Sequence, residues 1–229
     1  MQGLMCGRLS QNLDPTRLQS LFDLPSSRTI EPRWNIAPGS PLLAVRDNGA
    51  NRDLVPLRWG LIPPWAKTLD ISLKTFNARA ESVADKPSFA GAFRSRRCLI
   101  PADGFYEWEQ RSGRKLPWLI RRRDGMPLAL AGLWERWQPA GAVAIESCTI
   151  ITCPANRLLA RIHHRMPVVL EQESWRDWLN PAVAVREEVL RPAAGDILEM
   201  LPLDPVVNSA SAEGPDCQRP RGENQLRLF

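Results

Sequence analysis

The sequence predicts a single α+β domain built on antiparallel β-sheet, and three observations lead to this prediction. The chain has 229 residues with 44% hydrophobic side chains, which is enough for one substantial core and excludes a disordered protein. Its apolar segments are short, follow one another in hairpin order and are separated by turns, in a chain with 21 prolines. No repeated strand–helix alternation, internal repeat or linker is visible, which argues against a parallel α/β sheet and against two domains.

The first half of the chain is expected to contain one capped helix and several strands. Asp14 supplies an N-cap acceptor and Pro15 suits the first helical position, so a helix is predicted from there through TRLQSLFDL. Strands are predicted for short apolar segments bounded by glycine and proline: PLLAVR, DLVPLRWGLI and the two halves of RRCLIPADGFYEWEQ, which a turn divides.

The second half predicts further strands and two short helices. Asp124-Gly125 lies between the apolar runs KLPWLIRRR and MPLALAGLWERW and predicts a tight hairpin that joins them. AIESCTIITC predicts a buried central strand, after which Pro154 starts a helix over PANRLLARI. The last helix is expected in EQESWRDWLN, with Trp175 and Trp178 on one face.

Composition narrows the class of protein. No apolar run reaches the roughly 20 residues that cross a bilayer, and the N-terminus lacks a secretion signal, so a soluble, cytoplasmic protein without a membrane partner is expected. The five cysteines include no CxxC pair, which argues against a disulfide framework and a zinc site; Cys98, Cys148 and Cys153 are expected in the core. A net charge of +5 permits a polyanionic partner without requiring one.

Cys6 follows Met5 directly, and the position of the true N-terminus decides its chemistry. With a peptide bond before it, Cys6 offers only a thiol, with a reference pKa of about 8.5. As the first residue it also carries an α-amine, which can attack an aldehyde to give an imine that the thiol closes into a five-membered thiazolidine ring. An ordinary position in a leading strand is the alternative.

Two other positions are candidates for moving protons. Glu107 lies between Tyr106 and Trp108 after a glycine turn, where burial would raise the pKa of its carboxyl group and suit it to general acid–base catalysis; a surface charge on a strand is the alternative. His163 and His164 are the two histidines of the chain, and one is expected to face inward and one outward. A structural role is the alternative for either ring.

Polar and aromatic residues in other segments suit contacts to phosphates, sugars or stacked bases. Asn77 and Arg79 alternate in NARAES, so in an extended segment they would share a face and could hold a phosphate or sugar oxygen, although a turn-capping asparagine is the more ordinary role. Trp59 and Trp65 flank a rigid Pro-Pro pair and could wedge among bases or pack in the core. Arginines near Trp, Gly, Asn or Pro suit phosphate contacts or a solvated basic surface, and they include Arg8, Arg79 and Arg165.

Taken in order, these segments resemble one family. The ordered motifs are MCGR, RWNIAP, RWGLIPPWA, NARAES, RRCLIPADGFYEW, AGLWERW and IHHRMPVVL, within a span from Met5 to Asn208. They resemble the motif set of the SOS-response-associated peptidase (SRAP) family, whose members crosslink to abasic sites in single-stranded DNA. The resemblance implies a single α+β domain with a central, partly barrel-like antiparallel sheet and peripheral helices.

By motif, the resemblance implies that Met5 is removed and that Cys6 becomes the N-terminal nucleophile. The other catalytic residues it implies are Asn77, Glu107 and His163, and the predicted DNA-binding set is Arg8, Arg79, Trp59, Trp65 and Arg165. The residues MQGL ahead of MC depart from the family's start, so either translation begins at Met5 or the extra residues are cut off. If they stay attached, the amine is absent and thiazolidine chemistry is impossible.

The predicted organisation is a leader over residues 1–5, which is removed, an SRAP domain over 6–213 and a loose polar tail over 214–229. The predicted function is detection and processing of abasic sites in single-stranded DNA through a Cys6 thiazolidine crosslink, as part of the response to DNA damage. Self-cleavage ahead of Cys6 and weak lyase cleavage at abasic sites are expected side activities. No cofactor or metal is expected, and the protein should be a cytoplasmic monomer that joins the nucleoid when bound to DNA.

Two other functions stay open from the sequence. A thiol peptidase that pairs Cys6 with His163 needs only the thiol and would tolerate an intact leader. A non-catalytic module would bind intact and abasic single strands with equal affinity and marked salt dependence.

Overall fold

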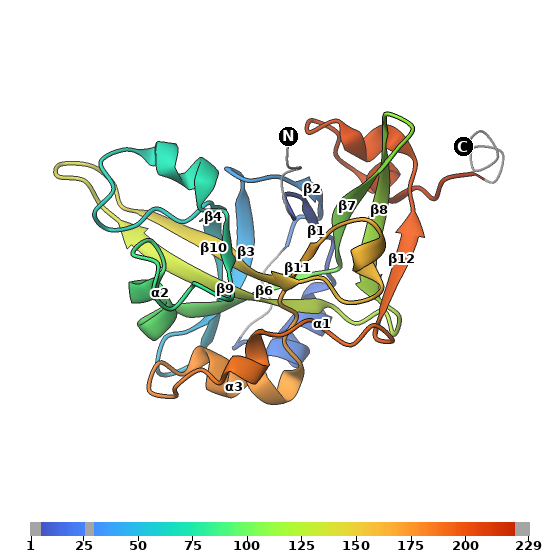
Figure 1. Cartoon of the computed structure of the whole chain (residues 1–229). Helices are drawn as coiled ribbons and strands as arrows, with labels where there is room; N and C mark the ends of the chain where they lie inside the picture. Colours follow the sequence, from blue (N-terminus) through green and yellow to red (C-terminus); the bar gives the residue numbers. More distant parts are fainter. Residues whose placement is uncertain (1–5, 26–29, 223–229) are drawn as a thin grey trace.

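Five strands close into a β-barrel at the centre of the molecule (Figure 1). The computed structural model describes residues 6–25 and 30–222. In order around the barrel, the strands are β10 (Ile145–Pro154), β4 (Arg52–Trp59), β3 (Pro41–Asp47), β6 (Arg97–Ala102) and β9 (Leu128–Trp137), which pairs again with β10. These pairs are antiparallel except for β10–β4, which is parallel. The predicted α+β fold with a partly barrel-like sheet is confirmed.

Strand β10 is the strand on which the other pairings converge. On one edge it pairs with β9 and then, at Thr152–Pro154, with β11 (Arg165–Pro167). On the other edge it pairs in parallel with β4 and then with β5 (Asn77–Arg79). Its segment 147–153 is buried throughout, which confirms the predicted central strand.

A second, antiparallel sheet packs beside the barrel. Its strand order is β12 (Leu198–Pro202), β8 (Arg114–Arg122), β7 (Gly104–Arg111), β1 (Leu9–Gln11) and β2 (Arg33–Ile36). Phe105 and Ile120, on one face, join the main core, whereas Tyr106 and Leu119, on the other face, form a second apolar cluster with residues from the C-terminal segment. The sheet therefore lies between the barrel and the chain after residue 202.

Short helices surround the sheets (Figure 1). The α-helices are α1 (Pro15–Phe22), α2 (Ala90–Ser95) and α3 (Gln172–Leu179), and the 3-10 helices are η1 (Leu69–Lys74), η2 (Leu159–Arg161), η3 (Glu187–Leu190), η4 (Pro205–Asn208) and η5 (Pro215–Gln218). The Asp14 side chain accepts a hydrogen bond from the Thr16 amide at 2.9 Å, as the cap prediction requires. Both Trp175 and Trp178 of α3 are buried, so the predicted apolar face is also confirmed.

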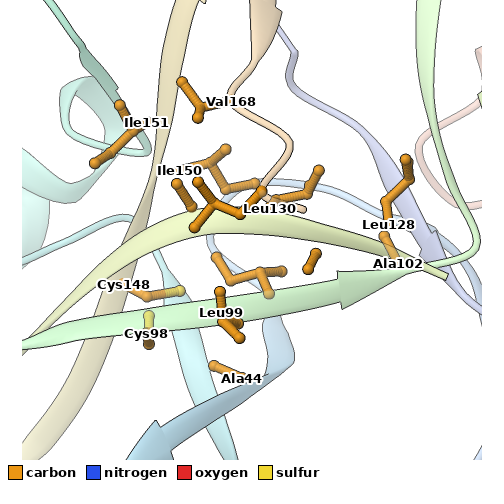
Figure 2. Close-up of a cluster of buried hydrophobic side chains, with 14 of the residues drawn as sticks. Ala44, Cys98, Leu99, Ala102, Leu128, Leu130, Cys148, Ile150, Ile151 and Val168 are labelled. Carbon is orange, nitrogen blue, oxygen red and sulfur yellow. The ribbon is translucent and has the colours of Figure 1, made fainter. Parts of the chain in front are cut away.

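Branched aliphatic side chains fill the barrel, and Figure 2 shows Leu99, Leu130 and Ile150 converging from β6, β9 and β10. Cys98 and Cys148 lie among them, fully buried, and Cys153 is equally buried. The three predicted core cysteines are confirmed. Among the described residues no helix has the length and apolar character needed to cross a membrane.

The hairpin predicted at Asp124-Gly125 is wrong. Strands β8 and β9, on either side of this turn, belong to different sheets, and β8 instead forms a hairpin with β7 across Ser112-Gly113. Asp124 still organises a turn, because its carboxylate accepts hydrogen bonds from the Met126 amide at 2.9 Å and from the Arg122 side chain. Turn chemistry fixed the chain reversal but not the partner of each strand, which longer-range packing decides.

The segments after β10 and at the C-terminal end also differ from the predictions. Pro154 is the last residue of β10, and the predicted helix is reduced to the single turn η2. Residues 214–222 are anchored at two points: Cys217 is buried, and buried Arg221 donates from Nε to the Leu203 carbonyl at 3.1 Å. The tail was predicted to be loose because it is rich in polar residues, but a main-chain carbonyl satisfies the polar side chain of Arg221 inside the fold. The predicted leader and residues 223–229 lie outside the described residues.

Candidate active site around Cys6

Cys6 lies just before β1, with 1% of its surface exposed. Its backbone nitrogen donates to Glu107 Oε1 at 2.9 Å, and its carbonyl oxygen accepts from Asn77 Nδ2 at 3.3 Å. The pairing of β1 with β7 brings Cys6 beside Glu107, a residue 101 positions away, and β5 supplies Asn77 from the barrel side. The structure therefore brings together three of the residues that the sequence predicted to be catalytic.

Glu107 is a buried carboxyl group, with 2% of its surface exposed. Burial raises its pKa to about 8, against the opposite effect of hydrogen bonds from the backbone of Cys6 and Trp108. Near neutral pH the group is therefore mostly protonated and can donate a proton, which suits a general acid that later acts as a base. The alternative, a surface charge on a strand, is wrong.

The Cys6 thiol is held in its neutral form. Burial raises the pKa of the thiol well above its usual value, and the adjacent Glu107 carboxylate raises it further. Since the thiolate is the strong nucleophile, a resting Cys6 is poorly prepared for direct attack through sulfur. The backbone nitrogen of Cys6, rather than its sulfur, is the atom that contacts the Glu107 carboxyl group.

Asn77 and Arg79 sit at alternate positions of β5, with buried Ala78 between them. Asn77 is half-buried against Cys6, whereas Arg79 is exposed. They share one face of the strand, as the sequence indicated, and this face leads from Cys6 to solvent.

His163 precedes β11, which lies across β10 from β5 at the level of Thr152. Its ring is half-buried and stacks on exposed His164 with a centroid distance of 4.6 Å, so one ring faces inward and one outward, as expected. Its Nδ1 is 3.1 Å from both the amide nitrogen and the carbonyl oxygen of Arg165. Burial lowers its pKa, so the ring is neutral near pH 7. Within the described part of the chain, no hydrogen bond joins His163 to Cys6 or Glu107.

The family model described as SOS response associated peptidase (SRAP) matches residues 5–210. The chain belongs to the SRAP family. Its relatives include abasic site processing protein YoqW of Bacillus subtilis, 40% identical over 93% of this chain and 98% of that protein, and the Gallus gallus protein HMCES, 32% identical over 94% and 78%. A crystal structure of a Bordetella bronchiseptica protein has a TM-score of 0.76 at 30% identity and covers 87% of this chain and 100% of its own.

Arg8 of this SRAP protein is half-buried and already has internal partners. Its Nη1 donates to Asn35 Oδ1 at 2.6 Å and to the Val207 carbonyl at 3.1 Å, and its guanidinium lies 5.4 Å from the Trp108 ring centre. Buried Asn35 is itself held by main-chain carbonyls of residues 209 and 212. Sequence reasoning missed Asn35 and gave Trp108 no role of its own. Both fix the direction of the Arg8 guanidinium.

The environment of Arg165 does not fit its predicted role in DNA binding. It is buried, and its guanidinium pairs with Glu81, including Nη2 to Oε2 at 2.9 Å, and also binds the Thr152 carbonyl. These partners occupy the guanidinium, so Arg165 ties the His163 loop to the turn after β5 instead of facing solvent. Glu81, two residues after Arg79 in NARAES, was not identified from the sequence.

The two tryptophans around the Pro-Pro pair have separate environments. Trp59 is fully buried, and its indole nitrogen donates to the Phe76 carbonyl at 2.8 Å. It has no exposed surface to offer a base, so the packing alternative is correct for Trp59. Trp65 is 58% exposed and stays a candidate for base contacts.

Proposed function

We propose that this SRAP protein processes abasic sites in single-stranded DNA by forming a covalent thiazolidine crosslink through Cys6, after removal of the residues that precede it. The observation that carries the proposal is the 2.9 Å contact between the Cys6 nitrogen and Glu107 Oε1. A buried acid beside a nascent α-amine is the arrangement that imine formation needs. Relatives named as abasic site processing proteins support the same substrate.

The chemistry proceeds in two bond-forming steps. The Cys6 amine adds to the aldehyde of the ring-opened abasic sugar, and the adduct loses water to give an imine. The thiol then adds across the C=N bond, with sulfur on carbon and its proton delivered to nitrogen, which closes the five-membered ring. Glu107 donates and recovers the protons of these steps, Asn77 orients Cys6, and His163 exchanges a proton with the sugar oxygen.

Two side activities follow from the same groups. Cys6 has a φ of 31°, a left-handed value that costs energy in a non-glycine residue and that would be released when the preceding peptide bond is cut. This strain, beside Glu107, supports self-cleavage ahead of Cys6. The imine also acidifies the adjacent sugar carbon, so loss of that proton with departure of the 3′ phosphate would break the strand as a minor lyase reaction.

Of the alternatives, the thiol peptidase is less well supported. It needs a Cys6 thiolate, and burial together with Glu107 opposes that form. A purely non-catalytic binding module does not require an ionisable carboxyl group to be buried beside the Cys6 nitrogen, and that burial costs free energy.

Recognition of the strand is proposed to rest on Arg8 and Arg79, with Trp65 against a base. The protein is proposed to act as a cytoplasmic monomer that associates with the nucleoid through DNA. Because phosphate contacts release counterions, its affinity for single-stranded DNA should fall as salt rises.

Variants of Cys6 test the crosslink. Protein that begins at Cys6, verified by intact mass, should form a heat-stable adduct with abasic single-stranded DNA, and Cys6→Ala should form none. Cys6→Ser keeps the amine, so borohydride should trap its imine although no heat-stable adduct accumulates. A heat-stable adduct from Cys6→Ala would contradict the proposal.

The two tryptophans should separate affinity from stability. Trp65→Ala should weaken binding to single-stranded DNA by about fivefold or more, because base stacking contributes about 1–3 kcal/mol, while unfolding stays within about 0.5 kcal/mol. Trp59→Ala should lower the free energy of unfolding by about 3–5 kcal/mol. Filter binding and denaturant titration measure these effects; unchanged affinity in Trp65→Ala would remove it from the site.

A further inference from the structure

A pocket of about 340 Å³ lies between the second sheet and the segment that carries η2. Trp118 of β8 and Met200 of β12 line it from the sheet, and Leu158 and Ile162 line it from the other side. In Figure 1 the short turn η2 lies near β8 and β12. The volume falls in the range of small-ligand sites.

Two of the residues that line this pocket are direct neighbours of residues in the Cys6 site. Trp118 stands directly opposite Glu107 in the β7–β8 pairing, so the two side chains project from the same face of the sheet. Glu109, two residues further along β7, lines the pocket and accepts a hydrogen bond from Trp118 Nε1 at 3.2 Å. On the other wall, Ile162 immediately precedes His163. Single-stranded DNA that reached Cys6 would therefore pass close to this pocket.

The chemistry of the lining suits a nucleotide. Trp118 and the aliphatic side chains offer apolar surface for a base, and exposed Arg123 and Arg161 stand at the same pocket. Among the described residues neither arginine forms an ion pair, whereas the carboxylate of Glu199 is paired with Arg121 at 2.7 Å. The other carboxylate of the lining, Glu109, accepts the hydrogen bond from Trp118 Nε1. The two arginines, which have no ion pair within the described part of the chain, stand beside an aromatic ring and match a phosphate joined to a base.

We propose that this pocket holds the nucleotide next to the abasic residue in the same strand, with its base against Trp118 and its phosphate at Arg123 and Arg161. The inference rests on the proposed function of the Cys6 site. A free nucleotide has the same chemistry, but Trp118 pairs with Glu107 across β7–β8 and Ile162 directly precedes His163, and this proximity favours a neighbour within the bound DNA strand.

The test compares strands and variants. The strands carry an abasic site with ordinary neighbours, or with a baseless tetrahydrofuran as the 5′ or the 3′ neighbour. The variants are Trp118→Leu, Arg161→Gln and, as a charge-matched control on the surface of α3, Arg176→Gln. Adduct formation is timed at DNA concentrations below saturation. Dissociation constants are measured with tetrahydrofuran in place of the abasic site.

With ordinary neighbours, Trp118→Leu should slow adduct formation and weaken binding by about tenfold, as loss of one stacked base predicts. Removing the base on one side should slow the unchanged protein to the same degree, and on that strand Trp118→Leu should have no additional effect. Arg161→Gln should weaken binding to all three DNA strands, because each strand keeps its phosphates. Arg176→Gln should change neither the binding nor the rate of adduct formation.

Three results would overturn the proposal. Variants that match Arg176→Gln would show that the pocket is unused, and a Trp118→Leu defect equal on all strands would show a role other than base contact. Inhibition by millimolar deoxynucleoside monophosphate, without any dependence on neighbours, would assign the pocket to a free nucleotide. If no adduct forms but the dissociation constants follow the expected pattern, the crosslink chemistry fails and the pocket assignment stands.

Discussion

A chain that keeps its leader should form no heat-stable adduct with abasic single-stranded DNA, whereas the same chain cut before Cys6 should form it readily. The Cys6 nitrogen is already 2.9 Å from Glu107 Oε1, so cleavage would convert a positioned amide into a positioned amine. An amide lone pair is delocalised and cannot form an imine with the aldehyde. The thiol is identical in both forms and, on this mechanism, does not suffice alone.

The comparison needs one preparation measured twice. The residues before Cys6 are replaced with a protease recognition sequence, and cleavage there makes Cys6 the first residue. The same preparation is then assayed before and after cleavage. Intact mass reports any self-cleavage of the uncut chain, and Cys6→Ala in the same format should be inactive in both states. An adduct whose mass includes the leader would contradict an amine-dependent mechanism.

Glu107→Gln should slow crosslinking by about 10²–10⁴-fold, the usual contribution of a positioned general acid or base. Because burial raises the pKa of Glu107 to about 8, its acid form persists through neutral pH. The rate of the unchanged protein should therefore fall as pH rises through this region, and the fall should be absent from Glu107→Gln. In the chain that begins at Cys6, a protonated amine favours the carboxylate and moves the inflection below 8.

Stability provides an independent measurement of the same group. The folded state holds the Glu107 proton up to a pH of about 8, while an unfolded glutamate releases it near pH 4.3. Between these values the folded state binds more protons, so Glu107 makes the free energy of unfolding fall as pH rises. This slope of unfolding free energy against pH should disappear in Glu107→Gln and persist in the exposed control Glu173→Gln on α3.

For the crosslinking rate, a Glu107→Gln protein with the same rate and pH dependence as the unchanged protein would show that Glu107 has no part in catalysis.

Residues with local signatures behaved as the sequence predicted. Asp14 caps α1 because its carboxylate lies only two residues before the Thr16 amide from which it accepts a hydrogen bond. The alternation of side chains along β5 places Asn77 and Arg79 on one face. The Asp124 turn shows the limit of such signals, because it reverses the chain without pairing the strands beside it. Arg165 and Trp59 were predicted to contact DNA from the residues next to them in the sequence, yet Arg165 pairs with Glu81 and the Trp59 indole donates to the Phe76 carbonyl.

The amino-acid sequence by itself determined the α+β class, the ordered motifs and the residue types that meet at Cys6, because these depend on composition and on short-range pattern. Only the tertiary structure decided that the Glu107 carboxyl group is buried, that it faces the Cys6 nitrogen and that Asn77 holds the Cys6 carbonyl. Those contacts join residues far apart in the chain through the β1–β7 pairing and the packing of the second sheet on the barrel. Desolvation and proximity arise from that packing, so no local pattern specifies them.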